Sequence, residues 1–395
     1  MAVKPGYKQT EVGVIPEDWG VISLSDGFTI YAGGDVSKDS FSQDQSDAFP
    51  HPIFANAVQK NGLYGYTNEA RSKADSLTIT ARGYLGHSEY RDQPFFPAVR
   101  LLVLEPKGKL DTRFTTYFVN DRIDFVSEST GVPQLTAPQV AKYAVAAPTS
   151  LVEQRAIATV LSDMDALLDG LDRLIAKKRA IKQATMQQLL TGQTRLPGFS
   201  GEWEVKRLGD VVNIDPENLG GDTPKNFRFN YISLEDVEEG VLRNYSEQIF
   251  STSPSRARRK ICKYDVLVST VRPNLKSHLI FSENFGEWVC STGFCILRCP
   301  EGRIHPGYVF FHFFAGHVNR QINTLLTGSN YPAINSSDVR ALEIPFPEYV
   351  EQAAIATILS DMDTEITALE TRRTKTRALK QAMMQELLTG RTRLI

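Results

Sequence analysis

A long stretch of this sequence occurs twice. Residues 153–196 and residues 351–394 align without a gap, and 27 of the 44 aligned positions are identical. Identity at this level over such a length does not arise by chance, and a solenoid would need several shorter repeats. The sequence therefore indicates an internal duplication, in which the chain consists of two related halves.

Each copy of the repeat has the pattern of one long helix that needs a partner helix. Apolar residues recur alternately four and three positions apart, as in the seam of a coiled coil. The first seam consists of Ile157, Leu161, Met164, Leu168, Leu171 and Ile175, and the second of Ile355, Leu359, Met362, Ile366 and Leu369. Ser150 and Glu153 have capping-box spacing, and Pro347 can open the second helix. Gly192 and Gly390 stand where each helix can end in a left-handed cap.

The charges along each repeat predict how the two helices pair. The N-terminal half of each repeat is acidic and the C-terminal half is basic, which also suits the helix dipole. Antiparallel pairing sets acid against base, whereas parallel pairing sets like charges against each other. We therefore expect an antiparallel intramolecular pair. The alternative is that the charges form a solvated helix face with no role in pairing.

A segment of roughly 150 residues precedes each helix, and the two segments are weakly related. Trp19, Val21, Leu24 and Asp26 recur as Trp203, Val205, Leu208 and Asp210. Strand-like runs lie at 76–82, 98–106, 265–272 and 293–299, and helical stretches lie near 113–120 and 307–325. The sequence predicts an α+β protein with two mixed α/β domains, residues 1–148 and 193–346, separated by two long helices, residues 149–192 and 347–395. Antiparallel pairing of these helices as a coiled coil would relate the two halves by a pseudo-twofold axis.

The composition is that of an ordinary globular protein of 395 residues, with 42% hydrophobic and 23% charged residues. No apolar run is long enough to span a membrane, and the first residues lack the apolar core of a secretion signal. All four cysteines lie in the second half, which favours a reducing cytoplasm over a disulfide framework. The formal net charge of −2 argues mildly against nucleic-acid binding unless the basic groups gather on one surface.

The order of domain, helix, domain and near-copy helix resembles the DNA-specificity subunits of type I restriction-modification enzymes. The resemblance rests on EVGVIPEDW at 11–19, TGVPQLTAPQV at 130–140, the first repeat from Glu153, and the helix ends LLTGQTRL and LLTGRTRL. It implies two target-recognition domains, each reading one half of a bipartite, asymmetric double-stranded DNA site. It also implies that the paired helices set the spacer between the half-sites.

The same resemblance implies partners and a location. The helices would dock two modification (methyltransferase) subunits that methylate adenine, and restriction subunits, which are translocases, would join that core. The partners would use S-adenosylmethionine, ATP and Mg²⁺, whereas this chain would hold no cofactor or metal and would have no catalysis of its own. The expected location is the cytoplasm of a bacterium or archaeon.

Candidate DNA-reading residues are those whose side chains can contact bases or phosphates from loops and strand ends. In the first domain they are Asn56, Lys60, Tyr64, Arg82, His87, Arg91 and Gln134. In the second domain they are Arg256, Arg258, Arg259, Lys260, Arg272, Asn274, Lys276, Asn330 and Tyr331. Arg82 and Arg272 stand out because each ends a predicted strand, at what the sequence suggests are matching places in the two halves. The alternative for both is an ion pair within the domain, and for residues 256–260 a solvated loop.

Two other functions remain open from the sequence. Asp92, Glu105 and Lys107 imitate the Asp…Glu-x-Lys constellation of metal-dependent nucleases, although Pro106 is awkward inside an active strand. A pure protein scaffold, with domains that bind protein, would also explain the helices. The spacing of Cys290, Cys295 and Cys299 lacks the paired Cys-x-x-Cys pattern of a zinc site.

Overall fold

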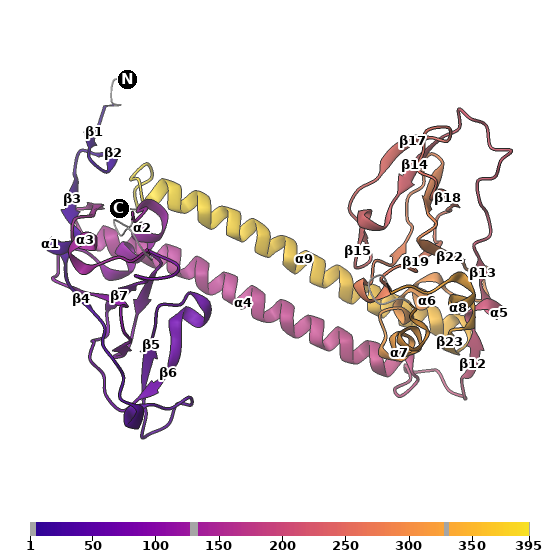
Figure 1. The fold of residues 1–395 in the computed structure, drawn as a ribbon, viewed down its shortest axis with the longest axis horizontal. Helices are drawn as coiled ribbons and strands as arrows, with labels where there is room; N and C mark the ends of the chain where they lie inside the picture. The colour runs from indigo at the N-terminus through magenta and orange to yellow at the C-terminus, as the bar shows by residue number, and fades with distance from the viewer. Residues whose placement is uncertain (1–4, 127–132, 328–331, 395) are drawn as a thin grey trace. The chain divides into compact units, whose positions relative to one another are not determined.

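The computed structural model describes residues 5–126, 133–327 and 332–394. It divides into two compact units, in which Met1–Asp172 with Arg372–Ile395 form unit 1 and Arg173–Thr371 form unit 2. Each unit contains one mixed α/β domain and part of both long helices, α4 (Leu151–Leu190) and α9 (Tyr349–Leu387) (Figure 1). The predicted fold class is confirmed. Within the described residues, no helix has both the length and the apolar character to cross a membrane.

Unit 1 is built on a four-stranded antiparallel sheet in the order β4–β10–β7–β8. The strands are β4 Phe28–Ala32, β10 Leu102–Pro106, β7 Ser76–Ile79 and β8 Ser88–Arg91. All four residues of β7 are buried. Helix α2 (Thr112–Arg122) packs on β7 and β8, and its Phe114 and Phe118 belong to the same core cluster as Leu77 and Ile79 of β7. A second sheet, β6–β5–β9, consists of β6 Leu63–Thr67, β5 His51–Phe54 and β9 Phe96–Pro97. The remaining elements are the hairpin β1 Tyr7–Thr10 and β2 Gly13–Pro16, the pair β3 Trp19–Ser23 and β11 Ala144–Pro148, and the short helices α1 Leu24–Gly27 and α3 Ala137–Ala141.

Unit 2 repeats this plan. Its first sheet has the order β13–β22–β19–β20, with β13 Asn213–Ile214, β22 Phe294–Arg298, β19 Val266–Ser269 and β20 Leu279–Ile280. Its second sheet has the order β17–β14–β21–β18, with β17 Ser246–Ile249, β14 Arg228–Ile232, β21 Trp288–Ser291 and β18 Ala257–Lys260. The other elements are β12 Glu204–Arg207 with β23 Glu343–Phe346, β15 Val237–Glu238 with β16 Val241–Leu242, and the helices α5 Leu208–Val211, α6 Pro306–His312, α7 Gly316–Leu325 and α8 Ser336–Ala341.

The strand pairings show how closely the domains correspond. In each second sheet one pair of strands is parallel, β5 with β9 in unit 1 and β14 with β21 in unit 2, while the other pairs are antiparallel. Strand β18 of unit 2, at the edge next to β21, extends the second sheet beyond its three-stranded counterpart. The weak sequence repeat therefore reflects one topology used twice.

The two long helices run antiparallel within each unit, as the charge pattern predicts. In unit 1 Asp165 pairs with Lys380 at 2.5 Å and Asp172 pairs with Arg373 at 2.9 Å, so residue numbers rise on α4 as they fall on α9. In unit 2 Lys182 pairs with Asp363, and Lys178 lies 2.7 Å from Glu365. Most of the predicted seam is buried: Ile157, Leu161, Leu168, Leu171, Ile175, Ile355, Leu359 and Ile366.

Each unit contains the same arginine–glutamate ion pair, at equivalent positions of the two repeats. Arg393 donates to both carboxylate oxygens of Glu153, at 2.5 and 2.7 Å, and Arg195 donates to both of those of Glu351, at 2.7 Å each. Each arginine lies in the segment after one long helix, and each glutamate lies in the first turn of the other long helix. The glutamate of the repeated EQ and the arginine of the repeated TRL thus bind each other, once in each unit.

One predicted helix is divided in two. The sequence suggests a helical stretch over 307–325, whereas the structure has α6 and α7 with a break at Phe313–Ala315. Ala315 is extended, with φ −82° and ψ 145°, because it precedes the first residue of α7 as an N-cap. The hydrogen bond from the Phe313 N–H to Phe310 shows that α6 tightens before it ends.

Candidate nucleic-acid interface

Two equivalent loops follow the central strands of the first sheets. In unit 1 the N–H of Leu135 donates to the carbonyl of Ala81 at 2.9 Å, and the backbones of Arg82 and Gln134 pair in an isolated β-bridge. In unit 2 the N–H of Ile334 donates to Thr270 at 2.9 Å, and Val271 bridges to Ala333. Each loop is therefore tied at its start to the chain segment that leads into a short helix, α3 or α8.

These bridges correct the predicted match between the two arginines. Arg82 occupies the position of Val271, and Arg272 occupies the position of Gly83, one residue further on. The backbone agrees, because Gly83 and Arg272 both have left-handed φ angles, of 79° and 48°. Side chains avoid this region, so Arg272 adopts a conformation that glycine supplies freely in unit 1. The prediction of matching positions is wrong by one residue, although each arginine is exposed on the equivalent loop of its own unit.

Three further candidates of unit 1 lie at or near a turn before strand β6. Lys60 is exposed and, like Asn61, has a left-handed backbone, with φ angles of 51° and 52°. Tyr64 is 59% exposed, and its ring lies 5.4 Å from that of Phe41. Asn56, in contrast, is half-buried, and its side chain binds the backbone of Ala81 and Val99, which positions it as support for the Arg82 loop.

The other candidates of unit 1 have protein partners. Arg91 is 5% exposed, donates to Thr78 and to the carbonyl of Asn61, and stacks on the Phe54 ring at 3.6 Å. Burial lowers the pKa of Arg91 to about 10. The half-buried His87 ring lies 2.8 Å from Glu89, and the half-buried Gln134 pairs with Arg82 through the backbone in an isolated β-bridge. Arg91 therefore holds the turn at Asn61 in place and is not exposed to a ligand.

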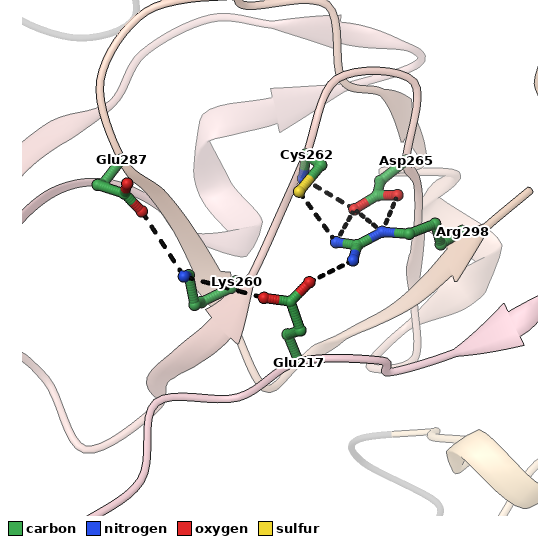
Figure 2. Close-up of polar contacts among 6 residues, drawn as sticks. All are labelled: Glu217, Lys260, Cys262, Asp265, Glu287 and Arg298. Carbon is green, nitrogen blue, oxygen red and sulfur yellow. Dashed lines mark hydrogen bonds and ion pairs between the residues drawn. The ribbon is translucent and has the colours of Figure 1, made fainter. Parts of the chain in front are cut away.

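The basic cluster of unit 2, residues 256–260, is neutralised by acidic neighbours at two of its four basic residues, Arg259 and Lys260. Arg259 forms an ion pair with Asp215, and Lys260 lies between Glu217 and Glu287, at 3.9 and 3.8 Å (Figure 2). Arg258 is half-buried and folds over the Phe250 ring at 4.9 Å. The consecutive basic residues of the sequence therefore lie along strand β18, and each has different neighbours.

Figure 2 shows that Glu217 also belongs to a second ion pair of this cluster. Arg298 binds Glu217 at 2.5 Å and donates to Asp265 at 2.9 Å. Its guanidinium lowers the pKa of Glu217, while burial raises the pKa of the neighbouring Cys262 thiol. The network joins the end of strand β18 and the turn before strand β19 to the end of strand β22, which is a structural role.

The remaining candidates of unit 2 are Arg256, Arg272, Asn274, Lys276, Asn330 and Tyr331. Arg256 is exposed before the neutralised part of β18, and Arg272 and Asn274 are exposed on the loop that follows β19. Lys276 is half-buried, with a left-handed φ of 54°. Asn330 and Tyr331 lie outside the described residues. The structure thus places one exposed arginine on each of the two equivalent loops, Arg82 in unit 1 and Arg272 in unit 2, with the exposed Asn274 near Arg272, while the roles of individual residues in DNA reading remain predictions.

Asp92, Glu105 and Lys107, the residues of the nuclease alternative, do not form one catalytic site. Strand β7 lies between β10, which carries Glu105, and β8, which precedes Asp92. Glu105 accepts a hydrogen bond from Tyr31 at 2.8 Å, and Lys107 donates to the carbonyl of Ser25 at 2.7 Å. Among the residues that the structure describes, no group of three or more His, Cys, Asp and Glu side chains has an arrangement suited to a metal ion.

Comparison with known proteins assigns the chain to a family. A family model described as the type I restriction modification DNA specificity domain matches it twice, at residues 16–181 and 200–378. The chain belongs to the type I restriction-modification DNA specificity family. It is therefore a type I specificity subunit, as the sequence resemblance predicts, and the two matches coincide with the two related halves.

Relatives and solved structures agree with this family. The specificity subunit of the type I restriction enzyme MjaVIII of Methanocaldococcus jannaschii is 21% identical over 96% of this chain and 94% of its own length. A candidate specificity subunit of Mycoplasma pneumoniae is 31% identical, over 34% of this chain and only 39% of its own length. The crystal structure of the type I S subunit from M. genitalium shares the fold, with a TM-score of 0.65, 14% identity and 98% coverage of both chains.

Proposed function

We propose that unit 1 and unit 2 each read one half of a bipartite, asymmetric double-stranded DNA site, and that the chain has no catalysis of its own. The observation that carries this proposal is the pair of equivalent loops, which begin at Arg82 and Val271, with the same attachment but different sequences, RGYLG at 82–86 and VRPNLK at 271–276. Two readers with one topology and different loops would recognise two different half-sites, whereas identical readers would recognise a palindrome.

The test is to map methylated adenines in cells that contain this chain with its methyltransferase partner. A motif with two different defined halves separated by undefined bases supports the proposal. Replacing residues 1–148 by the equivalent domain of another family member should change one half and leave the other. A motif that is palindromic or contiguous would contradict it.

We also propose that the long helices dock two copies of one modification subunit, to which restriction subunits are added. Support comes from exposed apolar side chains at repeated positions. Val152 and Val350 are 65% and 66% exposed at the starts of the two helices, and Ile181 and Leu379 are 42% and 54% exposed further along. Apolar side chains of this size at equal positions fit a partner that binds twice in the same way.

Stoichiometry tests this second proposal. Val152→Glu or Val350→Glu alone should reduce the number of bound modification subunits from two to one, and the double variant should bind none. Val241→Glu, at an exposed apolar residue outside the helix repeats, is the matched control and should leave two bound. Native mass spectrometry of the complexes measures the number directly, and two bound partners in the double variant would exclude this surface.

Two alternatives predict different results. A nuclease would cleave DNA as a lone chain with magnesium, and would lose that activity in Glu105→Ala. A pure scaffold would leave sequence-specific methylation by the complex unchanged when Arg82 and Arg272 are both replaced by alanine.

A further inference from the structure

Each of the two equivalent loops exposes one large apolar side chain. Tyr84 is 68% exposed in unit 1, and Leu275 is 58% exposed in unit 2. Neither residue belongs to the polar set that the sequence suggests for DNA reading. The two loops follow equivalent strands and have equivalent attachments, so each unit exposes one such side chain on the corresponding loop, although Leu275 lies two positions further along its loop than Tyr84.

The loop around Tyr84 is held firmly by its neighbours. The N–H of Gly86 donates to Thr80 at 2.8 Å, and Leu85 packs against the core of unit 1. Gly86 has a φ of +84°, and a Cβ there would lie 2.5 Å from the Phe125 ring. Leu85 packs against the core, whereas the neighbouring Tyr84 is exposed. The loop is therefore anchored by Leu85 and leaves Tyr84 on the surface.

The loop around Leu275 is held in a different way. The N–H of Leu275 donates to Arg272 at 2.9 Å and that of Lys276 donates to Pro273 at 3.0 Å, which forms one tight turn over the buried Pro273. Arg272 and Lys276, on either side of this turn, both have left-handed backbones, with φ angles of 48° and 54°. A non-glycine residue in this region is strained and persists only where the surroundings enforce it. The two strained residues therefore indicate that the surrounding structure holds Leu275 in one exposed position.

The charges beside these side chains favour a nucleic acid as the occupant. Arg82 is exposed two residues before Tyr84, and Arg272 and Lys276 flank Leu275, while neither loop tip contains an acidic residue. Cations next to an apolar tip suit DNA, because they can contact phosphates while the apolar group contacts bases, either at a thymine methyl or between base pairs.

We propose that Tyr84 and Leu275 make apolar contacts with bases, each in a different half of the DNA site, and so determine part of the specificity. This inference rests on the proposed bipartite reading. Alanine at either position removes the apolar contact and leaves the cations that attract DNA. Overall affinity should therefore fall modestly, and discrimination should fall at one or two base pairs in one half only.

The experiment measures methylation rates of the complete complex with its methyltransferase on a set of DNAs, each carrying one base-pair change in the site. For Leu275→Ala we expect discrimination to fall about tenfold at one or two adjacent base pairs of one half. For Tyr84→Ala we expect the same in the other half. Val241→Ala and Val14→Ala, at exposed apolar residues elsewhere in units 2 and 1, are controls and should retain the full profile.

The possible outcomes distinguish a failure of the proposed bipartite reading from a failure of the apolar contacts alone. A wild-type complex without a bipartite motif would overturn both the proposed function and this inference. A wild-type bipartite motif with unchanged profiles in both alanine variants would overturn the apolar contact alone. Reduced binding of the modification subunit in the Tyr84 and Leu275 variants, with an unchanged profile, would show that the tips bind protein and would likewise overturn it.

Discussion

Arg393 and Glu153, 240 positions apart in the sequence, form a two-point ion pair in which Glu153 is only 4% exposed. Arg393 also donates to both carboxylate oxygens of Asp18, at 2.9 and 2.8 Å, so one side chain joins three segments of unit 1. These bonds raise the pKa of Arg393, which therefore stays charged at any pH the protein survives. The pair links the segment after α9 to the first turn of α4.

Removing this arginine should destabilise unit 1. Arg393→Gln leaves the buried Glu153 carboxylate without its cation, and we expect the free energy of unfolding to fall by about 2 kcal/mol, less than for a fully buried pair because Arg393 is about a third exposed. Arg391→Gln is the matched control, since Arg391 is 64% exposed and lies 3.7 Å from Glu386. Urea unfolding followed by hydrogen exchange locates the effect, and equal losses in both variants would contradict this role.

The helix pair offers a comparison between two equivalent positions. Asp165 binds Lys380 and accepts a hydrogen bond from the Tyr117 hydroxyl at 2.7 Å. Asp363 binds Lys182, whose ammonium lies over the Phe311 ring, where no hydroxyl is present. Because a hydrogen bond to a charged group is worth more than a surface ion pair, we expect Asp165→Ala to cost about 1 kcal/mol more than Asp363→Ala.

Tyr117→Phe is the control for this comparison. In that background the Asp165→Ala and Asp363→Ala variants should lose similar amounts of stability, as measured by denaturant unfolding. A difference that persists without the hydroxyl would show that the two helix contacts differ for another reason.

Unit 2 should lose stability in acid through a buried histidine. Burial lowers the pKa of His278 to about 3, and its Nδ1 accepts a hydrogen bond from the Ser269 N–H at 3.1 Å. The unfolded chain takes up the proton near pH 6.5, whereas the folded chain resists it. The stability is therefore complete above pH 6.5 and is lost as the pH falls towards 3, by up to about 1.4 kcal/mol per pH unit.

The melting temperature as a function of pH tests this expectation. His278→Asn should flatten the acid decline of unit 2, although it lowers the melting temperature at pH 7. His51→Asn, in unit 1, should leave the decline of unit 2 unchanged. An identical acid slope in the His278 variant and the wild type would contradict the expectation.

Arg256 and Lys260 should differ in DNA binding although they are close in sequence. Arg256 is exposed, whereas Lys260 is already balanced by two carboxylates. Arg256→Ala in the complete complex should weaken binding to all sequences and reduce the slope of log affinity against log salt by about 1. Lys260→Ala should have a smaller effect, and an equal or larger one would show that DNA displaces the carboxylates.

Much of the architecture could be predicted from the sequence because its signals are local or repeated. The seam and the charge polarity are read directly from the helix repeats, and the four predicted strands lie at β7, β10, β19 and β22. The roles of individual repeat positions are less accessible. Spacing predicts a capping box for Glu153, whereas its carboxylate oxygens both bind Arg393, which a local motif cannot reveal.

The candidate site shows the same limit more strongly. The run Arg256–Lys260 suggests a basic surface, but its partners Asp215, Glu217 and Glu287 come from other segments that only the fold brings near. Arg91 also satisfies the rule for a DNA-reading residue, yet it lies beneath a turn. Exposed Tyr84 and Leu275 carry no signal in the sequence, because exposure of an apolar residue depends on which neighbours are anchored in the core.

The exchange of one domain between two family members, followed by mapping of methylated adenines, tests the assignment of reading to the two units most directly. With residues 1–148 replaced, the complex should methylate a hybrid site in which one half is new and the half read by unit 2 is unchanged. A motif that changes in both halves, or in neither, would contradict independent reading by the two units.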